Sequence, residues 1–197
     1  MQKNLNDIVI TNALRTPIGK YNGNLASYQA HDLGSEIIKK LLIDSKISPE
    51  EIDEVIMGQV LTGNAGQNPA RQCANKAGIP NNKTAFIVNQ VCGSGLRSIA
   101  LGYQSVKLND TKIIIAGGQE SMTNCDKDVM LKDGLIDAFK KYHMGITAEN
   151  VAEQWSISRK QQDNFAFNSQ LKAQLAINKN KFKDEMIDIL GFKDEHP

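Results

Sequence analysis

Short apolar runs alternate with amphipathic segments along the first 121 residues, and this alternation constrains the fold more than any other feature. The runs are DIVIT (7–11), VIMGQV (55–60), AFIVNQV (85–91) and KIIIAGG (112–118). Strands that are apolar on both faces need cover on both faces, which is typical of a parallel sheet between helices. The sequence therefore predicts an α/β fold, with a mixed, mostly parallel sheet and helices on both faces.

The segments between these runs carry helix signals. Apolar residues recur at helical spacing over residues 33–43, and Asn68-Pro69 begins a second helix that ends before Gly78. A third helix is predicted over residues 95–108, with an apolar stripe formed by Leu96, Ile99, Tyr103 and Val106.

The character of the chain changes after Ser121. Residues 123–134 are polar and typical of turns, whereas 147–155 and 158–177 are predicted helices. The second of these helices begins with a capping box and has an expected inner face formed by Phe165, Ala166, Ser169 and Ala173. We predict an α/β domain over residues 1–121 and a mainly helical domain over 122–197.

Composition excludes several classes of function. The formal net charge is +1 and charged residues make up 23% of the chain, which argues against a nucleic-acid partner or an anionic membrane. No apolar run approaches the roughly 20 residues that span a bilayer, and no signal peptide is expected. The three cysteines lie far apart without a CxxC pair, so we expect neither a metal site nor disulfides, and a cytoplasmic location.

Cys92 lies where a predicted strand ends and a helix begins, a place where reactive groups gather in open α/β sheets. We expect unpaired N–H groups of the first helical turn to point at its sulfur, and the helix dipole to favour the thiolate. The same groups can bind an oxyanion on an acyl group. Gly93 and Gly95 are expected to allow a sharp turn and to leave room for a carbonyl. The pattern favours acyl transfer through a thioester on Cys92.

Other interpretations of this stretch stay open. A lone intracellular cysteine is often a small buried hydrophobic residue. The letters GSGLRS also supply two of the three glycines of a dinucleotide-binding loop, with Ser98 in the third place and Glu120 late for a ribose contact. Ser94 is a weaker nucleophile candidate, because its surroundings do not match GxSxG.

The remaining cysteines and the histidines carry weaker signals. Cys73, inside a predicted helix, is expected to fill the core, and Cys125 lies in a polar stretch with no evident role. His143 precedes a predicted helix and is interpreted as a capping residue or a pocket residue. His31 and His196 are expected to be structural or solvated, so no histidine is marked as the base that a cysteine nucleophile needs.

Several longer stretches resemble one family. The segments NQVCGSGLRSIALGYQSV, AGGQESMT, YHMGITAENVAEQW, LRTPIGKYNG, GNAGQNPARQ and SRKQQDNFAFNSQ are similar to the thiolase family, and most to its biosynthetic, acetoacetyl-CoA-forming branch. The similarity runs from Ile8 to Pro197. It implies an acyltransferase that condenses two acetyl-CoA into acetoacetyl-CoA plus coenzyme A, reversibly, through an acetyl-cysteine. The coenzyme A thioester is the substrate, and no metal or nucleotide cofactor is implied.

The resemblance also assigns roles to single residues. It implies that Cys92 is the nucleophile and that its backbone N–H contributes to one oxyanion hole. Leu135 and His143 correspond to positions that line the groove for coenzyme A, and Met144 to a position near the acyl pocket. Residues 68–72 match a segment at the dimer interface, so a homodimer is the expected assembly.

Three departures from the family pattern are visible. The NEAF, GHP and CxGGG motifs, which supply the second oxyanion hole, the base and the second cysteine, are absent from this chain, so it is expected to lack turnover by itself. Residues 124–130 replace a longer stretch that includes a tetramer-forming hairpin, so no tetramer is expected. The stretch over residues 182–197 is also shorter than the corresponding stretch of the family. By the resemblance, residues 122–197 begin the loop domain that covers coenzyme A, and the last strand of the α/β domain is missing.

Two alternatives to this function are considered. A β-ketoacyl synthase acting on a carrier protein would use a similar nucleophile, but YHMGITAENVAEQW is typical of coenzyme A users. The other alternative is a non-catalytic, truncated thiolase paralogue that acts only through interaction surfaces. Without the second half, we expect sheet edges and a large apolar face to be left uncovered.

Overall fold

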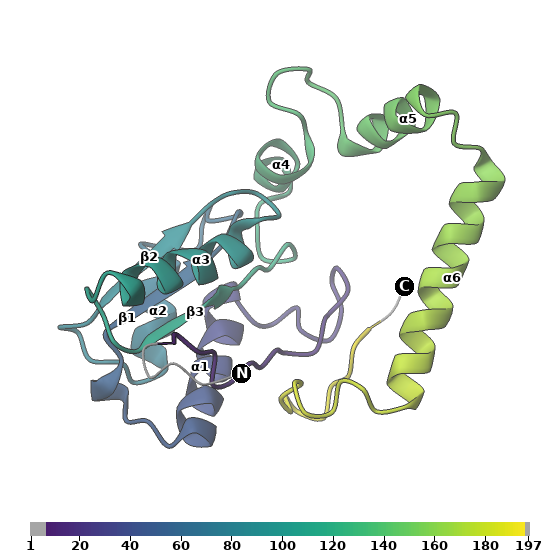
Figure 1. Cartoon of the computed structure of the whole chain (residues 1–197). Helices are drawn as coiled ribbons and strands as arrows, with labels where there is room; N and C mark the ends of the chain where they lie inside the picture. The colour runs from purple at the N-terminus through teal and green to yellow at the C-terminus, as the bar shows by residue number, and fades with distance from the viewer. Residues whose placement is uncertain (1–6, 196–197) are drawn as a thin grey trace.

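A computed structural model describes residues 7–195 and contains one three-stranded sheet (Figure 1). Its strands are β1 (Glu54–Gly58), β2 (Thr84–Val88) and β3 (Ile114–Gly118), in the order β2-β1-β3. Both pairings are parallel, and the last residues of β1 and β3, Gly58 and Gly118, lie opposite each other. The predicted α/β class is confirmed, and because the strands are parallel, all three carboxyl ends lie at one edge of the sheet.

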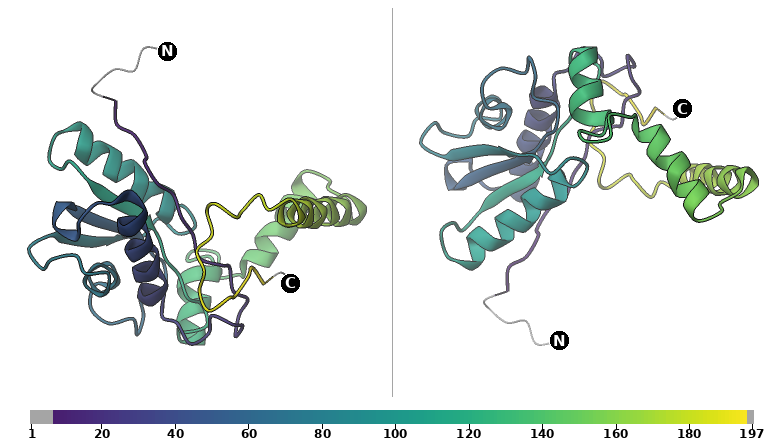
Figure 2. Two further views of the ribbon diagram at one scale, coloured as in Figure 1. Left: turned by 90° about the horizontal axis from the view of Figure 1, so that it is seen from below. Right: turned by 90° about the horizontal axis from the view of Figure 1, so that it is seen from above.

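Helices cover both faces of the sheet (Figure 2). On one face α2 (Pro69–Lys76) packs against β1 and β2, and α1 (Ala30–Ser45) packs against α2. On the other face α3 (Ser94–Lys107) packs along all three strands. A short 3-10 turn, η1 (Pro49–Glu51), leads into β1 and has the capping box of Ser48 and Glu51 at its start.

The main core lies between the sheet and the α1–α2 layer. Its buried members are Ile38, Leu42, Ile52, Val55, Met57, Ala70, Cys73, Ala74, Ala77, Ile79 and Ala85. Cys73 is fully buried, so the prediction that it fills the core is confirmed. This layer anchors β1, whose last residue begins the wall of the site described below.

Helix α3 packs on the sheet through small residues rather than through its apolar stripe. Ser94, Ser98 and Gly102 are its buried residues, and they lie four positions apart along one face. Leu96 is 75% exposed and Tyr103 52% exposed, so most of the predicted apolar stripe faces away from the sheet. Within the described residues, this stripe of α3 is therefore an exposed apolar face.

The run DIVIT does not form the predicted buried strand. Residues 7–11 have no regular secondary structure, and Val9 and Ile10 are 69% and 76% exposed. A strand needs a neighbour for its backbone N–H and C=O groups. No described residue pairs with this run, and that is the physical reason for the difference.

The chain after Ser121 leaves the sheet and forms further helices (Figure 1). Residues 123–134 are predicted to be turns, but they form α4 (Lys127–Met130) and most of the π-helical turn η2 (Leu131–Leu135). The Asp126 side chain explains the start of α4, because it accepts hydrogen bonds from the backbone N–H groups of Asp128 and Val129.

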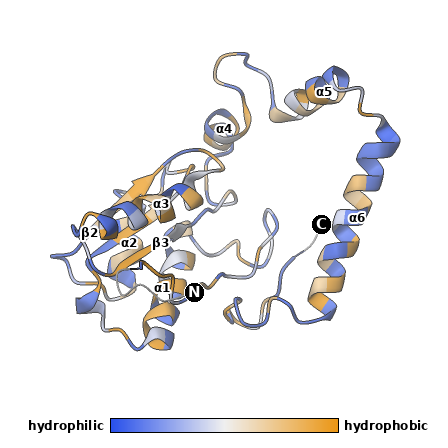
Figure 3. Cartoon of the chain, viewed as in Figure 1, coloured by the Kyte–Doolittle hydropathy of each residue, from blue (hydrophilic) through white to orange (hydrophobic). Residues whose placement is uncertain are grey.

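Two predicted helices follow, α5 (Met144–Gln154) and α6 (Arg159–Asn178). The capping box of Ser158 and Gln161 is present at the start of α6. Neither helix has a buried residue, and Phe165 is 80% exposed, so the expected inner face of α6 is not covered within the described chain. Figure 3 shows apolar residues scattered along α6 among polar ones.

The C-terminal segment returns to the N-terminal segment and is held there by Arg15. The Arg15 guanidinium donates to both carboxylate oxygens of Asp194, at 2.8 and 2.9 Å, and its Nε donates to Glu185 at 2.8 Å. The same guanidinium lies 5.0 Å from the centre of the Phe182 ring. Beside it, the Ile187 N–H donates to the Arg15 carbonyl at 2.9 Å. We refer to these contacts of Arg15 as the clasp.

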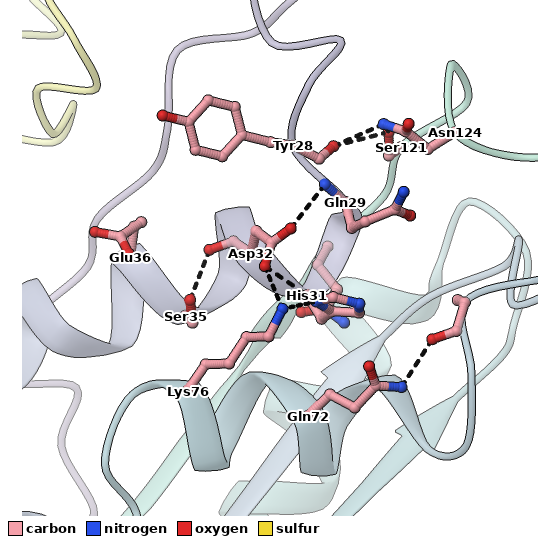
Figure 4. Close-up of polar contacts among 12 residues, drawn as sticks. Tyr28, Gln29, His31, Asp32, Ser35, Glu36, Gln72, Lys76, Ser121 and Asn124 are labelled. Atoms are coloured by element: carbon pink, nitrogen blue, oxygen red, sulfur yellow. Dashed lines mark hydrogen bonds and ion pairs between the residues drawn. The ribbon is translucent and has the colours of Figure 1, made fainter.

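The chain that leaves the sheet is held by the same N-terminal segment. The Asn124 side-chain amide donates to the carbonyls of Ala26 and Tyr28 at 3.0 and 2.8 Å, and Ser121 lies beside it (Figure 4). The segment that precedes α1 therefore contacts both the departing and the returning ends of the helical part. Among residues 7–195, no helix combines the length and the apolar character that a membrane crossing requires.

Candidate active site

Cys92 lies in the tight connection between β2 and α3, and its side chain is exposed. Ser94 holds this connection together, because its hydroxyl donates to the Val91 carbonyl at 2.6 Å and accepts from the Gln90 N–H at 2.8 Å. Val91 itself has a φ of 49°, a left-handed conformation that is unfavourable for a β-branched residue. We call residues 89–93 the elbow.

The geometry of the elbow differs from two expectations. The N–H groups of Gly93 and Ser94 donate to the carbonyls of Gln90 and Val91, both at 3.0 Å, so these two groups do not point at the Cys92 sulfur. The left-handed residue of the turn is Val91 rather than Gly93, whose φ is −82°. The turn is therefore produced by the Ser94 contacts and a strained valine, and not by glycine freedom.

Three glycines bring the ends of β1, β3 and α3 together below the elbow. A Cβ on Gly58 would lie 2.6 Å from the Gly95 nitrogen, and a Cβ on Gly118 would lie 3.4 Å from the Gly95 Cα. A Cβ on Gly95 itself would meet no atom closer than 3.8 Å, so the absence of a side chain is required mainly at Gly58. The close contact fixes the start of α3, and with it Cys92, at the carboxyl edge of the sheet.

A cavity of about 400 Å³ opens at this edge and includes Cys92. Its lining residues are Gly58, Gln59, Val60, Leu61, Val91, Cys92, Ser94, Gly95, Gly118, Gln119, Glu120, Met122, Met130, Gly134 and Leu135. The wall thus comes from the ends of β1 and β3, the elbow, and the α4–η2 turn. Such a cavity is large enough for the acyl end of a small thioester.

The structure brings Cys92 and Leu135 into this cavity and leaves His143 and Met144 outside its lining. Leu135 is the last residue of η2, and the next residue, Ile136, pairs with His143 across an antiparallel bridge. His143 is the N-cap of α5, where its Nδ1 accepts from the Gly145 N–H at 3.0 Å. Met144, the first residue of α5, is 39% exposed.

Two further cavity residues are Gln59, for which the sequence predicts no role, and Glu120, which was considered only as a ribose contact. The Glu120 carboxylate accepts from the Val60 N–H at 2.9 Å and from the Leu61 N–H at 3.1 Å. The Gln59 side chain is buried, donates to the Leu61 carbonyl at 2.8 Å, and accepts from Gln119 at 2.9 Å. A glutamine follows the terminal glycine of both β1 and β3, and this repeat is a sequence signal for Gln59 and Gln119 but not for Glu120.

The alternative interpretations of the elbow, a dinucleotide-binding loop or a nucleophilic Ser94, require side chains that are free to contact a ligand. Glu120 is engaged by backbone N–H groups, and Ser98 is buried and donates to the carbonyls of Gly95 and Gly117, so neither presents a free group to a ribose. The Ser94 hydroxyl is used within the elbow. Among residues 7–195, no three His, Cys, Asp or Glu side chains gather to hold a metal ion.

The other thiols and the histidines have structural surroundings. Burial raises the pKa of Cys73 to about 12, and burial also raises the pKa of Cys125. His31 is buried, with its Nδ1 3.0 Å from the Lys76 ammonium, which also contacts Asp32 (Figure 4). The structural interpretation of His31 and the capping interpretation of His143 are confirmed, and His196 lies outside the described residues.

Comparison with known proteins identifies relatives over almost the whole chain. The family described as "Thiolase, N-terminal domain" matches residues 8–128 and 125–196. The two matched segments meet within residues 124–130, where the sequence analysis places a shortened connection.

Individual relatives carry consistent names. The acetyl-CoA acetyltransferases of Rhizobium meliloti (strain 1021) and Paracoccus denitrificans are 49% and 48% identical over 91% and 92% of this chain. A probable acetyl-CoA acetyltransferase of Escherichia coli (strain K12) is 44% identical over 94% of it. The matches cover 50%, 50% and 52% of those proteins, so the chain spans about half the length of the curated relatives it matches. The chain belongs to the thiolase family, of which it carries the N-terminal domain.

Proposed function

We propose that the gene product to which this chain belongs is an acetyl-CoA acetyltransferase with Cys92 as its nucleophile. The observation that carries this proposal is the 49% identity, over 91% of the chain, to a protein named acetyl-CoA acetyltransferase. The exposed position of Cys92 in a cavity at the carboxyl edge of the sheet supports it, because a nucleophile must be reachable by its substrate.

In the first step, the Cys92 sulfur attacks the acetyl carbonyl of acetyl-CoA. A bond forms between that sulfur and the carbonyl carbon, the bond from the carbon to the coenzyme A sulfur breaks, and the released coenzyme A takes up the proton of the Cys92 thiol. Splitting the overall reaction into two transfers replaces one difficult step by two easier ones. We propose that Leu135, at the rim of the cavity, and His143 and Met144 beyond it contact the coenzyme A substrate.

In the second step, a second acetyl-CoA loses a proton from its methyl group, and the resulting carbanion attacks the acetyl-cysteine. Acetoacetyl-CoA forms and Cys92 leaves as the thiol after it recovers a proton. These transfers need an acid–base group. Of the histidines that the structure describes, His31 is buried against Lys76 and His143 caps α5, and neither lines the cavity. We propose that the base comes from outside residues 7–195, in line with the GHP and CxGGG motifs of the family.

The test is covalent labelling of the full-length gene product with acetyl-CoA, read by mass spectrometry of the tryptic peptides. We expect an acetyl group on the peptide that contains Cys92, no such group in Cys92→Ala, and normal labelling in the control Cys125→Ser, whose thiol lies outside the cavity lining. Unmodified Cys92, or turnover that survives Cys92→Ala, would contradict the proposal. A gene product that ends at Pro197 and is not acetylated would support the non-catalytic alternative.

The assembly, the cellular location and the domain boundary of the protein are also part of the proposal. We propose that the protein acts as a homodimer in the cytoplasm without a metal or nucleotide cofactor, and that its domain boundary lies near Ser121. The three free cysteines fit a reducing compartment. The position of α5 and α6 apart from the sheet supports the boundary. Sedimentation of the full-length protein tests the assembly, and a tetramer would contradict it.

A further inference from the structure

The segment Gln59–Leu61 forms the wall of the cavity at the end of β1, and it is held by side chains at the end of β3. The ladder between β1 and β3 stops before it, because the last paired residues are Gly58 and Gly118 and the Gln119 N–H donates to the Gly58 carbonyl at 2.9 Å. On the β2 side, the Gln59 N–H still donates to the Val88 carbonyl at 3.1 Å. Beyond that point, the N–H groups of Val60 and Leu61 have the Glu120 carboxylate as their acceptor, at 2.9 and 3.1 Å. The Glu120 carboxylate therefore replaces a strand carbonyl as the acceptor for the N–H groups that follow the last paired residues.

The wall also contacts the second side of the cavity. A Cβ on Gly134 would lie 3.5 Å from Cδ2 of Leu61, so Leu61 packs against η2, which carries Leu135. The position of residues 60 and 61 therefore sets the space between the elbow and η2. Glu120 is an exposed residue at this cavity, and the partial removal of its carboxylate from water raises its pKa.

The same kind of contact occurs once more, at the opposite edge of the sheet. The Asp53 carboxylate, just before β1, accepts from the N–H groups of Lys112 and Ile113 at 2.7 and 3.1 Å. Asp53 and Glu120 both join the β1 and β3 segments through two consecutive backbone N–H groups. Only Glu120 does so beside Cys92, because Asp53 lies at the amino ends of the parallel strands.

We propose that Glu120 is a positioning residue for acyl transfer to Cys92, acting by fixing residues 60 and 61 as the wall that receives the substrate. The inference rests on the proposed function, because it assumes that a thioester occupies the cavity. Glu120 takes no part in the bonds that form or break. When its contact is weakened, the wall moves and the substrate is bound less well, while the reactivity of the exposed Cys92 sulfur is kept.

The experiment compares Glu120→Gln with the matched variant Asp53→Asn in the full-length gene product. The rate of Cys92 acetylation is measured against acetyl-CoA concentration, and the rate of Cys92 alkylation by iodoacetamide is measured in parallel. Hydrogen bonds to a charged group are strong enough that we expect Glu120→Gln to raise the half-saturating acetyl-CoA concentration about tenfold. The limiting rate and the alkylation rate should change by less than about twofold, because only binding is affected.

Asp53→Asn serves as the structural control and should leave both reactions unchanged. Equal effects of the two variants, or a tenfold loss of iodoacetamide reactivity in Glu120→Gln, would overturn the inference and leave the proposed function intact. A wild-type protein that acetyl-CoA does not acetylate would overturn both, and the wild-type arm alone reveals this. If Glu120→Gln does not fold, Glu120→Asp and its match Asp53→Glu replace the pair with the same expectations.

Discussion

The backbones of Gly58 and Gly95 are in direct contact, although the first ends a strand and the second begins a helix. A Cβ on Gly58 would lie 2.6 Å from the Gly95 nitrogen and 2.5 Å from the Ser94 carbonyl carbon. The atoms that it would meet belong to the backbone and cannot rotate away. This contact places the first turn of α3, and the elbow that precedes it, against the end of β1.

We expect Gly58→Ala to destabilise the protein by about 1–3 kcal/mol, because the added methyl group must push α3 away from β1. The measurement is the free energy of unfolding in urea. Gly117→Ala is the matched control, since a Cβ at Gly117 in β3 would meet no atom within 4 Å, and we expect a change of less than about 0.5 kcal/mol. Equal effects of the two substitutions would contradict the contact.

The three thiols differ in accessibility, which predicts an order of chemical labelling. Cys92 is exposed, whereas Cys73 is fully buried and burial raises its pKa to about 12. At mildly alkaline pH we expect iodoacetamide to label Cys73 at least about a hundredfold more slowly than Cys92, because Cys73 must be uncovered and ionised first. Peptide mass spectrometry over time measures both rates. In denaturing urea the difference should vanish, and a rapid reaction of native Cys73 would contradict the packing.

Most of the sheet unit could be predicted from the sequence, because its signals are local. The runs that form β1, β2 and β3 are continuous and apolar, and Ser48 and Asn68 are recognisable caps at the starts of η1 and α2. The predictions that were wrong concern features that depend on residues far away in the sequence. The run DIVIT has strand character, but no described residue pairs with it. Helix α3 has an apolar stripe, yet it packs closely on the sheet through its small face of Ser94, Ser98 and Gly102.

For the candidate site, too, the features set by neighbouring residues were predictable, and those set by distant residues were not. The place of Cys92 between a strand and a helix follows from neighbouring residues, and it was identified. The role of Glu120 depends on its contact with Val60, which lies 60 positions away, and no local pattern indicates it. The turn chemistry at Val91 was also missed, because the preference for glycine in left-handed turns is a tendency that the Ser94 hydrogen bonds override here.

The Asp53 carboxylate predicts an acid-sensitive contribution to stability. Hydrogen bonds from the N–H groups of Lys112 and Ile113 lower its pKa below the ordinary value of 3.8, with a smaller effect from Lys83. Its stabilising effect is therefore complete above the ordinary pKa and is lost as the pH falls through the lowered folded value. We expect wild type to exceed Asp53→Asn by at most about 1 kcal/mol near neutral pH, since the side chain is partly exposed, and by progressively less below about pH 4.

Urea unfolding of both proteins across this pH range measures the difference. Lys83→Gln is the control for the ion pair, because the Lys83 ammonium lies 3.8 Å from Asp53 and contributes less than the backbone donors. It should retain most of the pH dependence. A stability difference between wild type and Asp53→Asn that stays constant from neutral to acid pH would show that the carboxylate charge is not responsible.

The clasp predicts that the return of the C-terminal segment depends on the shape of the Arg15 side chain and not only on its charge. Lysine keeps the charge but cannot donate to both oxygens of Asp194 and to Glu185 in one plane. Since the Asp194 side chain is only 9% exposed, we expect Arg15→Lys to weaken the docking of this segment by about 1–2 kcal/mol. Hydrogen exchange at the Ile187 amide, which donates to the Arg15 carbonyl, should accelerate roughly 5- to 30-fold.

Arg159→Lys provides the comparison, because Arg159 pairs with Asp163 on the surface of α6 with both side chains more than 60% exposed. Exposed pairs of this kind contribute little, so exchange along α6 should stay within about a factor of two of wild type. Exchange in β1 and β2 should be unaffected by Arg15→Lys, since the main core lies elsewhere. Acceleration throughout the chain would mean that Arg15 supports global stability, and unchanged exchange at Ile187 would mean that the apolar contacts of Leu25 and Ile189 hold the segment without the clasp.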